Sequence, residues 1–85
     1  MQITNVQVRK VDWGNSVAGL ASVTFDESFV VRDLRVINGS NGLFVAMPSR
    51  KGGDGEYRDI CHPITAEFRN ELQDKVLQAF NQLEN

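Results

Sequence analysis

Two adjacent cations, Arg50 and Lys51, precede the glycine-rich stretch GGDG, and they are the residues of this chain best suited to bind an anion. A flexible backbone lets such side chains track a phosphate chain, and contacts to phosphates position a nucleic acid without distinguishing its bases. Arg58 lies on the predicted returning strand, and Arg69 lies one turn into a predicted helix. If the tip of the glycine-rich segment lies near the start of that helix, these four cations form a ridge. The alternative is that Arg50 and Lys51 are ordinary solvated loop residues.

Catalysis finds little support in the sequence. The single histidine, His62, and the single cysteine, Cys61, are neighbours, and neighbouring side chains on a strand point to opposite faces. A metal site needs three or four convergent ligands, and the GGDG segment lacks the Lys and Ser or Thr of a phosphate-binding loop. We therefore expect neither an enzyme nor a metal or cofactor. His62, which precedes Pro63, is interpreted as a structural junction with its ring hydrogen-bonded to the backbone, and Cys61 as a small buried apolar residue.

Other polar and aromatic residues favour structural roles. Asp33 and Arg35 lie two apart on a predicted strand and are expected to form an ion pair with each other or across strands. Arg32, beside them, is a weaker functional candidate. Trp13 and Tyr57 could stack on bases, but packing beside a turn and closing of a hairpin are the favoured interpretations.

Composition limits the partners and the compartment. The chain has 85 residues, with nine Lys and Arg against eleven Asp and Glu, so any binding of nucleic acid must come from a local basic patch. One cysteine suits a reducing compartment. The N-terminus shows no basic stretch followed by an apolar one, and no run of about 18 apolar residues occurs. We expect a cytoplasmic protein without a membrane partner.

The elements that hold these residues follow from hydrophobic periodicity. Alternation predicts strands over residues 4–11, 17–25, 29–37, 43–47 and 57–61, and the last three are expected to form an antiparallel unit with a mobile basic tip. In the third strand, Val30, Leu34 and Val36 are predicted to share one face, and apolar residues on both faces indicate a central strand. The turn NGSNG separates the third and fourth strands.

A change of period predicts one C-terminal helix over residues 65–84. Thr65 is the predicted N-cap, and the inner stripe comprises Phe68, Leu72, Val76 and Phe80. The prediction is a single α+β domain over residues 1–85, an antiparallel sheet of about five strands packed against this helix. A chain of this size buries only about 60–65% of its unfolded surface, which favours a homodimer formed through strand edges.

Two longer runs, VRDLRVINGSNGLFVAMPS and GEYRDICHPI, resemble the core motifs of the bacterial stage V sporulation protein G (SpoVG) family. The resemblance covers residues 23–77 and continues more loosely through the N-terminal strand. It implies a DNA-binding or RNA-binding regulator involved in sporulation and in the negative regulation of asymmetric septation.

The resemblance also bears on the site. It implies that Arg50, Lys51 and Arg69 match basic positions of the family pattern, whereas Gly52 and Gly53 replace an expected Thr-Pro-like pair. Many relatives continue into a polar tail, so a tail function is not expected of a chain that stops at Asn85. The alternative to nucleic-acid binding is a non-catalytic protein-interaction adaptor in division control.

Overall fold

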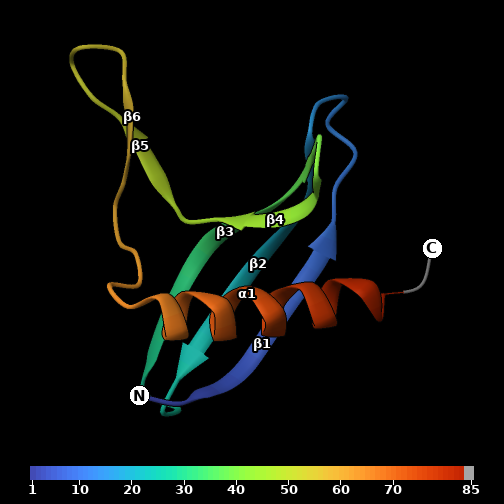
Figure 1. The fold of residues 1–85 in the computed structure, drawn as a ribbon, viewed down its shortest axis with the longest axis vertical. Helices are drawn as coiled ribbons and strands as arrows, with labels where there is room; N and C mark the ends of the chain where they lie inside the picture. The colour runs from blue at the N-terminus through green and yellow to red at the C-terminus, as the bar shows by residue number, and fades with distance from the viewer. Residues whose placement is uncertain (84–85) are drawn as a thin grey trace.

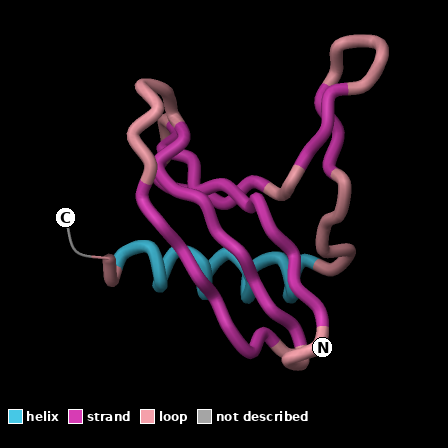
Figure 2. The backbone as a smooth tube through the Cα atoms, turned by 180° about the vertical axis from the view of Figure 1, so that it is seen from behind, coloured by secondary structure: helices cyan, strands magenta, loops and turns pink. Residues whose placement is uncertain are grey.

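The structure is a computed structural model that describes residues 1–83, and its centre is a four-stranded antiparallel sheet with one helix across one face (Figure 1). The strands β1 (Ile3–Lys10), β2 (Val17–Phe25), β3 (Phe29–Gly39) and β4 (Gly42–Ala46) lie side by side in chain order. The helix α1 (Ala66–Asn81) packs against all four strands, and Figure 2 shows the sheet from its other, uncovered side. The predicted α+β class, antiparallel sheet and C-terminal helix are confirmed.

Tight turns explain why consecutive strands are neighbours. Between β2 and β3, Asp26 and Glu27 both have positive φ, 51° and 53°, and the Ser28 N–H donates to the Phe25 carbonyl at 2.9 Å. Two successive positive φ angles define the type I′ turn, whose twist matches that of a hairpin. Between β3 and β4, Gly39 pairs with Gly42. The turn NGSNG predicted this second hairpin.

The core lies between the sheet and α1. The odd positions of β2 from Gly19 to Phe25 face inward, and Val23 is fully buried. On β3, the prediction that Val30 shares the inner face with Leu34 is wrong, because Val30 is 49% exposed. The register shifts between the pairs Ala21–Leu34 and Val23–Val31, which leaves one extra residue on β3. This β-bulge turns Val31 toward the core in place of Val30.

The helix begins and packs as its sequence predicts. The Thr65 hydroxyl accepts a hydrogen bond from the Phe68 N–H at 3.2 Å, which confirms the N-cap. Leu72 and Val76 are buried, and Phe68 and Phe80 pack against the core with partial burial. The helix ends at Asn81, so the prediction is wrong for Gln82 and Leu83, and residue 84 lies outside the described residues.

Near its C-terminal end the helix comes very close to the sheet. A Cβ atom at Gly19 would lie 2.9 Å from Phe80 Cε1 and 3.1 Å from the Arg9 carbonyl oxygen. Only glycine fits this position on β2 without displacing the ring or the neighbouring strand.

One predicted strand does not join the main sheet. The segment predicted as a strand over residues 57–61 is shorter, β6 (Tyr57–Asp59), and it pairs with an unpredicted strand, β5 (Ser49–Lys51), in a separate two-stranded sheet. The chain leaves β4 through Met47 and the buried Pro48, and proline cannot donate to a continuing ladder. Figure 1 shows the β5–β6 hairpin projecting away from the sheet and from α1. The prediction of about five strands in one sheet is thus corrected to six strands in two sheets within residues 1–83.

Candidate nucleic-acid interface

The projecting hairpin, residues 49–59, carries three of the four predicted contact residues, and we call it the basic ribbon. Arg50 pairs with Arg58, and Lys51 pairs with Tyr57. Directly opposite residues of a strand pair share a face, and successive residues alternate. Arg50 and Arg58 therefore lie on one face of the basic ribbon, while Lys51 lies with Tyr57 on the other.

The turn of the basic ribbon is held by hydrogen bonds. The Gly52 N–H donates to the Glu56 carbonyl at 2.8 Å, and the Gly55 N–H donates to the Gly52 carbonyl at 3.1 Å. The Asp54 carboxylate accepts from the Glu56 N–H at 3.1 Å. A Cβ atom at Gly52 would lie 2.7 Å from Arg58 Nη1, so this glycine makes room for the arginine. The glycine-rich segment thus forms a closed hairpin, and Arg50 and Lys51 belong to a strand instead of a loop.

The three cations of the basic ribbon differ in how free they are to bind a ligand. Arg58 Nη2 lies 2.6 Å from Asp54 Oδ2 in an exposed ion pair. The Arg58 guanidinium, together with the Glu56 N–H, lowers the pKa of the Asp54 carboxyl. Arg50 and Lys51 are exposed and make no ion pair with any residue between 1 and 83. The segment as a whole holds three cations and three carboxylates, so a binding surface here depends on which side chains face the ligand.

Arg69 does not belong to the same surface. It is exposed in the first turn of α1, and no Cα atom of α1 lies within 8 Å of one in β5 or β6. The expected ridge of four cations is therefore not formed within one chain. The basic ribbon brings Arg50 and Arg58 together, places Lys51 on its other face and leaves Arg69 apart, because the hairpin tip points away from the helix (Figure 1).

Arg35 has a structural role, but a different one from the predicted ion pair. Its guanidinium Nη2 donates to the Met47 carbonyl at 3.3 Å and to the Ser49 hydroxyl at 3.1 Å. Within the described chain it forms no ion pair with Asp33. Arg35 instead fixes the base of the basic ribbon to the sheet.

The Cys61–His62 segment fits its structural interpretation. His62 Nδ1 lies 3.0 Å from the Pro63 carbonyl oxygen, and Cys61 is half-buried against the core. The strand β6 ends before both residues. Among residues 1–83, no group of three or more His, Cys, Asp or Glu side chains is arranged to hold a metal ion.

Sequence reasoning missed two further surfaces. One is the uncovered face of the sheet, where Arg9 and Arg32 line a shallow hollow. Arg9 lies on the predicted first strand, but which side chains surround it depends on strand register. The other is an apolar groove between the β6–α1 connection and the end of the sheet. Its lining includes Phe29, Val31, Met47, Ile64, Phe68 and Leu72.

Comparison with known proteins places this arrangement among bacterial relatives. A protein-family model described as SpoVG matches residues 1–82. A relative from Clostridioides difficile (strain 630) is 55% identical over 82 residues, which cover 96% of this chain and 89% of that protein. A relative from Macrococcus caseolyticus is 51% identical over 99% of this chain and 73% of its own length. One from Staphylococcus aureus (strain MRSA252) is 48% identical over 99% of this chain and 84% of its own length.

These three relatives carry the same printed name, "Putative septation protein SpoVG", which mentions septation and no enzymatic activity. In the part of the chain that the structure describes, no helix is both long and apolar enough to cross a membrane.

Proposed function

This chain belongs to the SpoVG family, and we propose that it is a regulator of septation, and of sporulation in organisms that form spores, which acts by binding DNA or RNA through the basic ribbon. The observation that carries the proposal is the position of Arg50 and Lys51 on a hairpin that projects from the body of the protein, where neither forms an ion pair with a residue that the structure describes. Side chains presented in this way reach the phosphates of a nucleic acid without burial of the surrounding surface.

We also propose that the chain works as a homodimer. A two-stranded hairpin is marginally stable by itself in water, and the basic ribbon projects with Tyr57 and, just beyond it, Ile60 exposed at 68% and 66%. A second copy can pair with its edge and cover these side chains. A two-fold dimer would also present Arg50 and Lys51 twice, which doubles the number of phosphate contacts.

A gel-shift titration of the protein against duplex DNA, single-stranded DNA and RNA at low and moderate salt tests the proposal. We expect binding that weakens steeply as salt rises, because contacts to phosphates release condensed counterions. Absence of salt-dependent binding to all three would overturn the proposal.

The second candidate function is an adaptor that recruits a division protein. The observation in its favour is the apolar groove together with the exposed side chains of Phe29 (66%) and Ile64 (91%). The formally neutral charge of residues 49–59 points the same way. A protein that binds no nucleic acid, and whose function is lost on changing Phe29→Ser and Ile64→Ser, would fit the adaptor.

A further inference from the structure

The uncovered face of the sheet holds a second group of cations. This outer sheet face lies opposite α1 (Figure 2), and it contains a hollow of about 280 Å³. We call it the arginine hollow. Its polar lining consists of Gln7, Arg9, Ser22, Arg32 and Asp33, with Leu20 as an apolar member.

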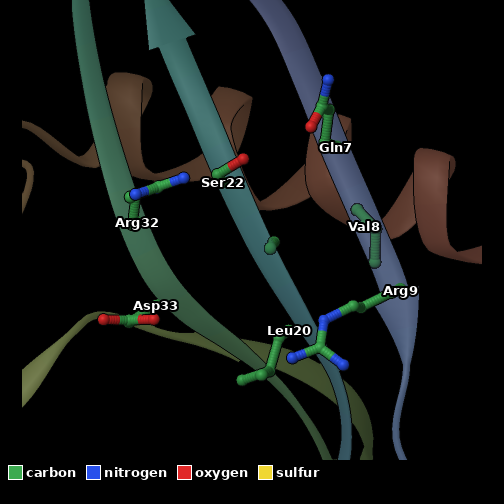
Figure 3. A pocket seen from close by; sticks show the side chains of 8 residues that line it. Gln7, Val8, Arg9, Leu20, Ser22, Arg32 and Asp33 are labelled. Carbon is green, nitrogen blue, oxygen red and sulfur yellow. The ribbon is translucent and has the colours of Figure 1, made fainter.

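Strand register explains why these side chains meet. Gln7 pairs with Ser22, and Arg9 pairs with Leu20, so β1 and β2 contribute two adjacent rows to one face. Figure 3 shows the Arg32 side chain extending from β3 toward Ser22, and the Arg9 side chain extending from β1 toward Leu20. The two arginines thus reach over β2 from opposite sides.

The β-bulge in β3 is what keeps Arg32 in this position. The pairs Ala21–Leu34 and Val23–Val31 leave Ser22 opposite both Arg32 and Asp33. Asp33 has φ of 64°, in the left-handed region that few residues other than glycine adopt and in which aspartate is more common than most. Because of this extra residue, Leu34 returns to the core while Arg32 and Asp33 both stay exposed. Bulges re-aim side chains in this way beside functional sites.

The two arginines have no internal partner. Among residues 1–83, the guanidinium groups of Arg9 and Arg32 form neither a hydrogen bond nor an ion pair, although Asp33 adjoins Arg32 in sequence. A guanidinium matches a phosphate group through two parallel N–H donors. The Ser22 hydroxyl and the Gln7 carboxamide add neutral donors beside them. The chemistry of the arginine hollow therefore fits a phosphate anion.

We propose that the arginine hollow binds the phosphodiester backbone of a single-stranded nucleic acid, a proposal that rests on the proposed function and adds a second surface to it. The outer sheet face is covered by no other element among residues 1–83 (Figure 2), which leaves room for an extended strand, and Leu20, the register partner of Arg9, offers apolar contact to a nucleoside.

The path continues to the basic ribbon. Arg35 pairs with Leu20 across β2 and β3, and its guanidinium contacts the hydroxyl of Ser49 at the ribbon base. By strand alternation, Ser49 shares its ribbon face with Lys51 and Tyr57. A strand that leaves the arginine hollow thus meets a further cation, Lys51, on this face of the basic ribbon.

Fluorescence anisotropy with a labelled oligothymidylate tests this surface. At about 0.1 M salt, loss of one phosphate contact should weaken single-strand binding about fivefold, so Arg9→Gln and Arg32→Gln should each have this effect. The pair together should weaken binding about 25-fold and flatten the slope of log affinity against log salt by about 1.4. Lys75→Gln, which removes an exposed cation from α1, is the matched control and should change the affinity less than twofold.

Unchanged affinity and slope in Arg9→Gln/Arg32→Gln, with a parent that binds in a salt-dependent manner, would overturn this inference and leave the proposed function standing. Equal losses for duplex and for single strands would overturn the assignment to single strands. A parent that binds no nucleic acid would overturn both proposals. Both side chains are exposed, so circular dichroism should show that the double variant is folded. If it does not fold, the affinities of the two single variants test the inference.

Discussion

Three cations, Arg50, Lys51 and Arg58, lie on the basic ribbon, but they differ in whether a neighbouring carboxylate already pairs with them. Asp54 Oδ2 lies 2.6 Å from Arg58 Nη2 in an ion pair, whereas Arg50 and Lys51 form no ion pair with any described residue. The Arg58 guanidinium lowers the pKa of Asp54, so this carboxylate stabilises the folded ribbon above its unfolded pKa, about 3.9. That contribution is lost as the pH falls through the lowered pKa. Between pH 5 and 8, titration of Asp54 should therefore alter neither folding nor binding.

Changing Asp54→Asn should strengthen duplex DNA binding, because Arg58 is released to contact a phosphate. The salt slope of binding should steepen by up to about 0.9 per chain, and the melting temperature should change little because the ion pair is exposed. The control is Asp74→Asn on α1, which changes the net charge equally. Equal gains for both variants would mean that total charge, and not the ribbon, governs binding.

At the scale of elements, the prediction from sequence succeeded where the hydrophobic period of a strand or helix continues without a break. β2 alternates from Gly19 to Phe25 and α1 keeps one apolar stripe, so these inner faces were predicted correctly, whereas α1 ends at Asn81 and not at residue 84. The bulge at Asp33 was not predictable from alternation, because an extra residue shows only against the partner strand. β5 was missed because Ser49–Lys51 has no apolar residue, and its strand form depends on pairing with β6. The separation of Arg69 from the ribbon likewise follows from the direction of the hairpin, which no local pattern specifies.

The inner face of α1 is tested by Leu72→Ala. Leu72 is 3% exposed, so removing its side chain should lower the free energy of unfolding by about 2–5 kcal/mol. Gln78→Ala, at an exposed position of the same helix, is the control and should change it by less than about 0.5 kcal/mol. Urea denaturation of both variants gives the comparison, and a Leu72 variant as stable as the parent would contradict the packing.

The close approach of helix and sheet is tested by Gly19→Ala. The added methyl group would press on Phe80 and on the Arg9 carbonyl, and overpacking of this kind costs about 1–3 kcal/mol. Gly53→Ala, where the new Cβ atom meets no atom within 4 Å, should be nearly neutral. Thermal melts that rank the two variants in the opposite order would show that α1 does not approach β2 as described.

At the scale of the whole molecule, the basic ribbon is formally neutral, an apolar groove lies beside α1, and the chain as a whole is slightly acidic. A net charge of −2 gives no long-range attraction to nucleic acid, so local placement of cations must supply the binding. The proposed dimer would support the projecting hairpin and would double the cations presented to one ligand.

Sedimentation velocity tests the dimer. We expect a dimer at micromolar concentration, and we expect Tyr57→Ser/Ile60→Ser to shift the protein toward a monomer because both side chains are exposed in the single chain. Ser40→Ala, in the turn between β3 and β4, serves as a control that should leave the dimer intact. A parent that sediments as a stable folded monomer would defeat the dimer proposal.

The most direct test of the central claim, that the basic ribbon binds nucleic acid, is the salt dependence of duplex DNA binding by Arg50→Ala/Lys51→Ala. Both side chains are exposed on a projecting hairpin, so the change should remove charge and leave fold and oligomeric state unchanged. If both chains of a dimer engage one duplex, four contacts are lost, and the slope of log affinity against log salt should flatten by about 3–4 units. Arg69→Ala, on a separate surface, should have a smaller effect. A double variant with the affinity and salt slope of the parent would contradict the account.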